Sequence, residues 1–315
     1  MKITIATPTF GIPTYLKECI ESVKQQSLTT LQIVYGGNLL SPNDIEGKNI
    51  KIINKDPDPG MVTCWNMAAS LTNTQYIGFL ADDNSLQPDF SKRMVSFMQQ
   101  HPTCEIVFCN QNYMNEKGLI DLKKSEELTK FFGRDLLPEG LVNKSYYKTI
   151  IQNNSIPLEA CLIRRSLWSS FGPFKEEAKG AFDQEFLFRI LLSGAKIGFI
   201  PDYLMNFRLH KGACSSRQKK EHLIGTIWTS EALMNKSQEY YSFFRKKNIS
   251  LKGRLLRFDL SFKDRVSLLK CLFFEKNGVE YIIKNSIIRM LFKINLSRNL
   301  KKIFSRKSGN NLNSK

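Results

Sequence analysis

The chain has 315 residues, 42% of them apolar, and a formal net charge of +17 at pH 7. This length allows one large domain or two smaller ones with a sizeable core. No apolar stretch reaches the roughly 18 residues of a membrane span, which argues against a bilayer-crossing protein.

Strands and helices alternate along the first part of the predicted structure. Short apolar and β-branched runs predict strands at 2–7, 31–35, 50–54, 76–81 and 105–110. Apolar residues at three- and four-residue spacing predict helices at 15–26, 61–71 and 90–100. This alternation favours an α/β fold, with a mostly parallel, Rossmann-like sheet flanked by helices.

The pattern weakens between residues 122 and 158, where polar and aromatic residues are mixed with prolines and glycines. We expect a long loop there, and loops of that length inside compact domains are often functional. Beyond it, the sequence predicts strands at 160–163 and 196–201 and a helix at 183–193.

Two adjacent carboxylates, Asp82 and Asp83, follow the apolar run 76–81 and are expected where a buried strand opens into a loop. Neighbouring like charges repel, and a divalent cation with a preference for oxygen ligands would relieve that repulsion. Open α/β sheets bind ligands at the carboxyl ends of their strands. The alternative on this stretch alone is an Asp-Asp-Asn turn before a helix that starts near Pro88.

Five motifs in consistent order carry a resemblance to a known family. They are Thr7-Pro8-Thr9-Phe10 with Tyr15-Leu16, Ser22-Val23 and Gln26, then Asp58-Pro59-Gly60 with Asn66, Leu80-Ala81-Asp82-Asp83-Asn84 with Pro88, Ala181-Phe182-Asp183-Gln184-Glu185-Phe186, and Phe207-Arg208-Leu209-His210. Over about residues 3–215 the chain resembles bacterial family 2 inverting glycosyltransferases of the GT-A fold, in the nucleotide-diphospho-sugar transferase superfamily. Any one motif is weakly specific, whereas five in order are fairly specific.

The resemblance implies a metal-dependent enzyme that moves a sugar from a nucleotide-diphosphate donor to a hydroxyl of a glycan or lipid-linked acceptor, in bacterial surface polysaccharide or lipopolysaccharide biosynthesis. It implies Asp183 as the catalytic base, and Asp83 with His210 as ligands of Mn²⁺ or Mg²⁺. The residues it implies for nucleotide-sugar binding are Thr7, Pro8, Thr9, Phe10, Asn38, Asp58, Asn66 and Asp82. A cation would neutralise the charge that develops on the departing diphosphate, and a carboxylate can accept the acceptor's proton.

Each of these roles has a structural alternative. Asp183 precedes a helical run and can serve as its N-cap, which is compatible with a base held on a rigid element. His210 can be an ordinary surface histidine. The sequence also departs from the family pattern, because Gly36 stands where an acidic base-recognition residue is expected and Phe182 where the catalytic segment usually has glutamate. Asn38 or Asp58 would then substitute in part for the missing acid.

The basic charge is concentrated at the C-terminal end. Residues 1–215 have a net charge of +1 and residues 216–315 have +16. We therefore predict a catalytic domain over 1–215, a basic helical region over 216–307 and a disordered tail over 308–315. Apolar residues at helical spacing, with lysines and arginines between them, indicate either a surface for an anionic membrane or a helical bundle with a solvated basic face.

Other function classes receive less support. A nucleic-acid-binding protein would fit the charge, but the sequence has no recognised nucleic-acid motif, and no nucleic-acid partner is expected. A dinucleotide-dependent enzyme would need a Gly-x-Gly-x-x-Gly turn after the first strand, which is missing. A catalytically inactive GT-A scaffold that binds membrane or nucleic acid remains the alternative. The seven cysteines have no paired metal spacing, and their surroundings predict buried thiols in a cytoplasmic protein, peripheral on the inner membrane face if the tail binds lipid.

Overall fold

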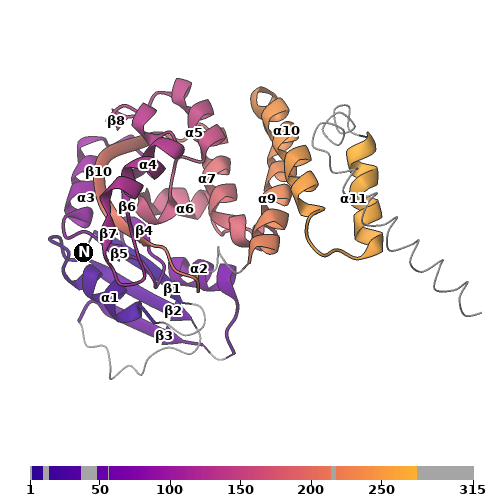
Figure 1. Cartoon of the computed structure of the whole chain (residues 1–315). Helices are drawn as coiled ribbons and strands as arrows, with labels where there is room; N and C mark the ends of the chain where they lie inside the picture. The colour runs from indigo at the N-terminus through magenta and orange to yellow at the C-terminus, as the bar shows by residue number, and fades with distance from the viewer. Residues whose placement is uncertain (1, 10–13, 37–47, 56, 214–217, 275–315) are drawn as a thin grey trace, which may run out of the picture. The chain divides into compact units, whose positions relative to one another are not determined.

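The computed structural model describes residues 2–9, 14–36, 48–55, 57–213 and 218–274 (Figure 1). Its internal contacts divide the chain into two compact units, Met1–Tyr241 and Ser242–Lys315. The predicted residues Phe10 and Asn38 lie outside the described residues, as do the predicted helical stretch beyond 274 and the predicted tail 308–315.

The first unit is built on one mixed sheet. In chain order its strands are β1 (Ile3–Thr9), β2 (Leu31–Gly36), β3 (Ile50–Asn54), β4 (Tyr76–Phe79), β5 (Ser85–Leu86), β6 (Ile106–Met114), β7 (Ile120–Asp121), β8 (Gly140–Leu141), β9 (Cys161–Arg164) and β10 (Ile197–Arg208). They are ordered β3-β2-β1-β4-β9-β6-β10-β5, with β7 paired to β6 and β8 paired to β10. The predicted α/β fold is thereby confirmed.

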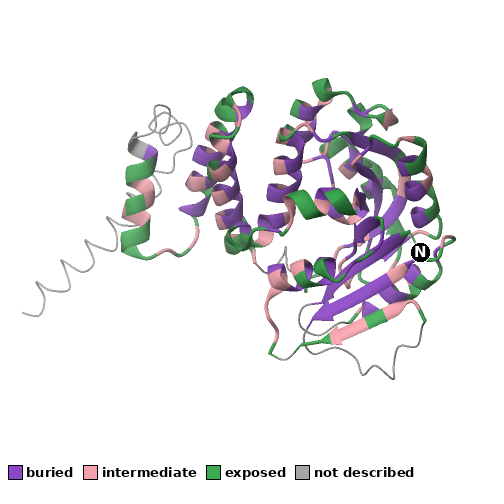
Figure 2. Cartoon of the chain, turned by 180° about the vertical axis from the view of Figure 1, so that it is seen from behind, coloured by how far each residue is buried: buried purple, intermediate pink, exposed green. Residues whose placement is uncertain are grey.

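Strand direction is less uniform than predicted. The pairs β1–β2, β2–β3, β1–β4 and β6–β10 are parallel. Strand β9 runs antiparallel between β4 and β6, and the short strands β5, β7 and β8 also pair antiparallel. The inner strands β1, β4 and β6 are buried along their whole length (Figure 2), as expected for a sheet covered on both faces.

Helices cover both faces of this sheet. They are α1 (Leu16–Lys24), α2 (Met61–Ser70), α3 (Phe90–Gln100), α4 (Leu122–Phe131), α5 (Tyr147–Asn153), α6 (Arg165–Phe171), α7 (Phe182–Leu192) and α9 (Lys219–Met234). On one face, α1 and α3 bury residues such as Cys19 and Met94 against Ile5 of β1 and Leu162 of β9. Helix α1 forms there because its apolar residues recur at three- and four-residue spacing, which gives it a single buried stripe.

An aromatic cluster fills the other face, beneath α2, α6 and α7. Its centre is Phe174, whose ring lies 5.3 Å from that of Phe79, 4.9 Å from Trp168 and 5.0 Å from Phe182. Close-packed rings contribute both burial and edge-to-face contacts. The cluster therefore fixes the start of α7 against the sheet, where the pocket described below opens.

The region 122–158 is more ordered than the predicted long loop. It contains α4, α5, strand β8 and the short 3₁₀ turns η2 (Arg134–Leu136) and η3 (Lys144–Tyr146). The amide of Lys124 donates to the Asp121 carboxylate at 2.9 Å, which caps α4. Apolar periodicity missed α4 because its only buried residues are the polar Ser125 and Thr129.

Helix α9 packs against the rest of the first unit through a glycine. A Cβ at Gly225 would lie 1.8 Å from the Ala178 carbonyl oxygen, so only glycine lets α9 approach the 3₁₀ segment η5 (Glu176–Ala181) this closely. The first unit consequently extends to Tyr241, one helix beyond the predicted boundary at 215.

The second unit begins within α10 (Gln238–Leu255) and contains α11 (Phe262–Phe274). Leu272 of α11 is buried against Ile249 and Leu256, with Leu268 and Leu269 beside them. The apolar stripe of α11 therefore covers a small core of its own. No helix among the described residues has the length and apolarity to span a bilayer, and binding of the basic region to a membrane stays a prediction.

Candidate active site

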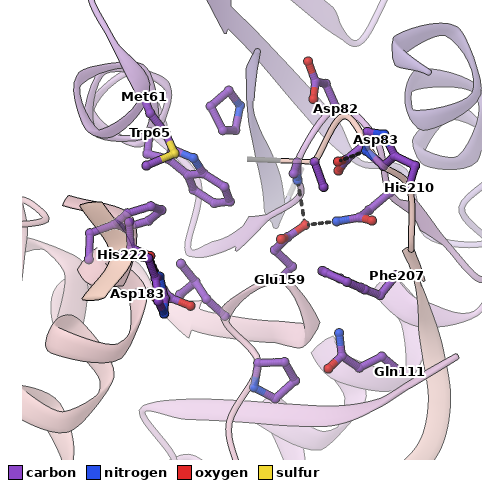
Figure 3. A pocket seen from close by; sticks show the side chains of 18 of the residues that line it. Met61, Trp65, Asp82, Asp83, Gln111, Glu159, Asp183, Phe207, His210 and His222 are labelled. Carbon is purple, nitrogen blue, oxygen red and sulfur yellow. Dashed lines mark hydrogen bonds and ion pairs between the residues drawn. The ribbon is translucent and has the colours of Figure 1, made fainter. Parts of the chain in front are cut away.

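A pocket of about 670 Å³ opens in the first unit, where β1, β4 and β6 end (Figure 3). Strand β1 contributes Pro8 and Thr9 to its wall, and the loop after β4 contributes Asp82 and Asp83. The hydroxyl oxygen of Thr9 is buried and has no hydrogen-bond partner. The pocket thus lies at carboxyl ends of parallel strands, where open α/β sheets bind ligands.

His210 and Asp83 meet at one side of this pocket. The His210 Nε2 atom lies 2.9 Å from Asp83 Oδ2, and both side chains are partly accessible. The edge-to-face contact with the ring of Tyr15, at 5.2 Å between centroids, orients the imidazole. Residues 127 positions apart are thereby brought together, and their role as metal ligands stays a prediction.

Arg208 fixes the backbone of the acidic loop. Its guanidinium is buried, donates from Nε to the Asp83 carbonyl oxygen at 2.9 Å and lies 4.3 Å from the centre of the Tyr15 ring. Its backbone amide donates to Asn84 Oδ1 at 2.8 Å, and its Nη2 pairs with Glu18 at 2.5 Å. Arg208 therefore positions Asp83 and His210 and does not itself line the pocket.

The pair of Asp83 and His210 fits a divalent cation. Two atoms that bind one octahedral cation at about 2.1 Å and at right angles lie about 3.0 Å apart, close to the separation found here. Within the residues that the structure describes, no cluster of three or more His, Cys, Asp or Glu side chains could hold a metal ion. A cation here would take its other ligands from a bound diphosphate and water, as Mg²⁺ commonly does.

Glu159 is a site residue that the sequence analysis missed. It lies in the short 3₁₀ turn η4 (Leu158–Ala160), and its Oε2 accepts from the Ala81 amide at 2.8 Å and from Asn84 Nδ2 at 2.6 Å. Burial, followed by the negative charge of Asp83, raises the pKa of Glu159 to about 8. Glu159 therefore ties the acidic loop to η4, and Figure 3 shows it between Asp83 and Asp183.

The raised pKa of Glu159 predicts a pH-dependent stability. The folded state holds a proton that the unfolded chain releases near pH 4.5, so the free energy of unfolding falls as pH rises from about 4.5 to 8 and is level above that. Glu159→Gln keeps an acceptor for both hydrogen bonds and removes the titration. We expect the wild-type melting temperature, measured by calorimetry, to fall by on the order of 5 °C more than that of Glu159→Gln between pH 5 and 8.

The exposed Glu126→Gln on α4 is the control for this comparison, and it should keep the wild-type profile. Parallel profiles for the wild type and Glu159→Gln would contradict the assignment of a protonated Glu159.

Asp183 lies across the pocket from Asp83, in the first turn of α7 (Figure 3). Its Oδ1 accepts from the Gln184 amide at 2.7 Å. Burial raises the pKa of Asp183, and the amide of Gln184 and nearby His222 act in the opposite direction. His222 of α9 also lines the pocket and donates from Nδ1 to the Gly180 carbonyl oxygen at 2.6 Å. The alternative role of Asp183 as an N-cap is wrong, because α7 begins at Phe182 with Ala181 at the N-cap position and no side-chain cap. A buried carboxylate in the first turn of a helix can accept a proton.

Three predicted binding residues do not line the pocket. Thr7 Oγ1 accepts from Gln32 Nε2 at 2.8 Å inside the sheet, and Asp58 Oδ1 accepts from the Gly60 amide at 2.8 Å before α2. Asn66 holds the backbone of Phe174 through two hydrogen bonds, of 2.8 and 3.0 Å. In this structure these side chains make hydrogen bonds within the protein, whereas Pro8, Thr9 and Asp82 line the pocket.

Both departures from the family pattern have a packing reason. A Cβ at Gly36 would lie 2.3 Å from both the carbonyl oxygen and Oγ1 of Thr9, so no carboxylate fits at this position. Phe182 is buried against Phe174 and Trp65 in the aromatic cluster, where an unpaired glutamate would be costly. Glu185, which follows in the same motif, is buried and paired with Arg189.

Comparison with known proteins identifies the family. Residues 4–155 match the sequence profile of Glycosyl transferase family 2. The N-terminal half of the chain is a glycosyl transferase family 2 domain. The matched segment includes Asp82 and Asp83 and ends before Glu159, Asp183 and His210. These three later residues are therefore placed in the site by the structure and not by the family match.

Solved structures share the GT-A fold of this family 2 domain. TarS 1-349 from S. aureus, in complex with UDP-GlcNAc, superposes with a TM-score of 0.60 at 14% identity, covering 89% of this chain and 82% of that chain. Mannosyltransferase PcManGT from Pyrobaculum calidifontis, in complex with GDP-Man and Mn²⁺, gives a TM-score of 0.55 at 11% identity, covering 92% and 80%.

Among curated proteins, the chondroitin synthase of Pasteurella multocida (strain Pm70) is 24% identical over 126 residues, which are 38% of this chain and 13% of that protein. The chain spans at most 24% of the length of the curated relatives that it matches.

Proposed function

We propose that the chain is a metal-dependent inverting glycosyltransferase that uses a nucleotide-diphosphate sugar. The single observation that carries this proposal is one pocket with the Asp83–His210 pair on one side and the buried Asp183 on the other, in a unit whose residues 4–155 match family 2. Each side offers a different chemistry, because a paired acid and imidazole suit a cation and a buried carboxylate with a raised pKa suits proton transfer.

The donor would bind on the side of β1 and β4. Pro8, Thr9 and Asp82 line this side. Mn²⁺ or Mg²⁺, held by Asp83 and His210, would supply positive charge to the diphosphate as it leaves. The likeness to structures that contain UDP-GlcNAc, or GDP-Man with Mn²⁺, supports a nucleotide sugar and a divalent ion.

The acceptor hydroxyl would approach from the side of Asp183. This carboxylate can take the proton from the attacking hydroxyl, and its raised pKa brings it closer to neutral pH, where a general base works best. Asp183 and the acidic loop face each other across the pocket, so attack opposite the leaving diphosphate needs no second nucleophile. That geometry favours inversion at the anomeric carbon.

The names of two relatives support a proposal for the acceptor class. Chondroitin synthase and hyaluronan synthase are named for polysaccharides, and both match this chain at 24% identity. We infer a glycan or lipid-linked acceptor, in the synthesis of a bacterial surface polysaccharide or lipopolysaccharide. A basic region with a net charge of +16 would keep such an enzyme near an anionic membrane surface.

A screen of nucleotide sugars by thermal unfolding tests the donor site. At a concentration of about 100 times its Kd, the correct donor adds about 2.7 kcal/mol to the free energy of unfolding, which raises the melting temperature by roughly 5–10 °C. We expect this rise with Mn²⁺ present and a much smaller one with EDTA. A panel of uridine-, guanosine- and cytidine-linked sugars in which none gives a metal-dependent rise would refute the proposed donor site.

A further inference from the structure

Arg134 is a buried arginine in the wall of the pocket. It begins the 3₁₀ turn η2, has 1% of its surface exposed and lines the pocket with Gln111 and Tyr113 of β6. Its Nη1 donates to Gln111 Oε1 at 3.0 Å, and its guanidinium lies 5.2 Å from the centre of the Phe132 ring. These contacts place the guanidinium without supplying any negative charge.

The charge of Arg134 has no partner of opposite sign. Its Nε and Nη2 atoms are buried without a hydrogen-bond acceptor, and in the described part of the chain no carboxylate forms a salt bridge with it. Burial lowers the pKa of Arg134. The Tyr113 hydroxyl opposes this effect most, through its charge and a side-chain hydrogen bond, followed by Cys109 and Tyr203, and all three groups are uncharged in their ordinary forms. A buried guanidinium with free donors and no counter-charge is costly, so this part of the wall is incomplete without an anion.

Two other arginines of the same unit show the contrast. Arg208, equally buried, pairs with Glu18 and donates to backbone carbonyl oxygens. Arg189 forms two hydrogen bonds with the carboxylate of Glu185. Each of these two guanidinium groups is therefore paired with a carboxylate of the protein. Arg134 alone among these three faces a ligand pocket with donors unused.

We propose that Arg134, together with Gln111, is a subsite for an anionic group of the acceptor, a carboxylate or a phosphate. A guanidinium presents a flat pair of N–H donors that matches either group. This inference rests on the proposed function, because it assigns the subsite to the acceptor of that reaction.

The position of the subsite points to the acceptor and not to the donor. Gln111 lies on the far side of Glu159 from Asp82 (Figure 3). Arg134 itself follows α4, within the region 122–158 where the sequence analysis expected a long and functional loop. The donor diphosphate would lie at the opposite end, beside Asp83.

Binding of small probes tests the subsite without requiring turnover. Methyl β-D-glucuronide is compared with methyl β-D-glucoside, and ribitol 5-phosphate with ribitol, by calorimetry in metal-free buffer. At least one ionic probe should bind tenfold or more tightly than its neutral partner. A preference for the glucuronide identifies a carboxylate and a preference for the polyol phosphate identifies a phosphate. The preference should vanish in Arg134→Gln and survive in part in Arg134→Lys.

Gln111→Glu provides a second variant that does not remove the arginine. It places a carboxylate where Gln111 Oε1 now accepts from Arg134, so it should raise the melting temperature by about 2–4 °C and abolish the preference for ionic probes. The control is Arg164→Gln, because Arg164 donates to the carbonyl oxygens of Cys104 and Met98 away from the pocket. That variant should lose stability and keep the preference.

Three outcomes overturn the inference: no ionic preference in the wild type, an ionic preference that survives Arg134→Gln, or a Gln111→Glu protein with unchanged melting and unchanged preference. The donor screen separates this result from the proposed function. Nucleotide binding without ionic preference leaves the transferase proposal standing alone. Ionic preference without nucleotide binding leaves an anion site in a protein of another function.

Discussion

Replacing Asp183 by asparagine is expected to reduce glycosyl transfer by about 10²–10⁴-fold while donor binding is unchanged. The two side chains have the same shape, and an asparagine Oδ1 can still accept from the Gln184 amide, so the start of α7 should keep its geometry. The amide cannot accept a proton from the attacking hydroxyl, which removes the contribution of a general base. Initial rates of nucleotide release, with the donor identified by the thermal screen, give the measurement.

The pH profile of the same reaction adds a second readout. Because burial raises the pKa of Asp183, the wild-type rate should rise with pH through a group that titrates above an ordinary aspartate, and this limb should disappear in Asp183→Asn. Asp121→Asn is a matched control, since asparagine also caps a helix and Asp121 lies outside the pocket. Wild-type turnover by Asp183→Asn would dismiss Asp183 as the base.

Local patterns in the sequence predicted the regular elements because those elements are specified locally. The strand at 50–54 and the helix at 90–100 have the bounds that apolar periodicity gave them. The assignment of Asp83 and His210 to one metal site, by contrast, rested only on the order of the family motifs. Nothing in either segment alone indicates that the two residues are neighbours. Tertiary contacts explain why the pair forms, because the buried Arg208 holds both segments.

Residues whose role depends on long-range placement could not be predicted. Glu159 is a single acid in the otherwise apolar run 156–163, a weak signal that became meaningful only when η4 was found against the acidic loop. Arg134 resembles any arginine in a polar segment until its burial is known. Asn66 is an example of the opposite kind: the family motif predicted a binding role for it, whereas in the structure its side chain holds the backbone of Phe174.

Replacing Asp83 by asparagine is expected to remove the metal-dependent part of donor binding and to lower transfer by at least about 100-fold. Removal of one preorganised charge that stabilises a transition state typically costs this much. Asparagine can still accept a hydrogen bond from His210 through Oδ1, and the contacts of Arg208 with the loop backbone do not involve the Asp83 side chain, so the loop should keep its shape. The measurement is the rise in melting temperature caused by donor plus Mn²⁺, compared with donor plus EDTA.

Asp89→Asn, an exposed position six residues along the chain, should retain both the rise and the activity. The comparison also separates a metal site from a plain ion pair between Asp83 and His210. If the pair only stabilises the fold, Asp83→Asn should melt lower than the wild type without any ligand, and Mn²⁺ should have no effect on the wild-type protein. If the pair holds a cation, the variant should melt close to the wild type in EDTA and differ only when metal and donor are both present. In that case the bound ion, and not the contact between the two side chains, raises the melting temperature of the wild type.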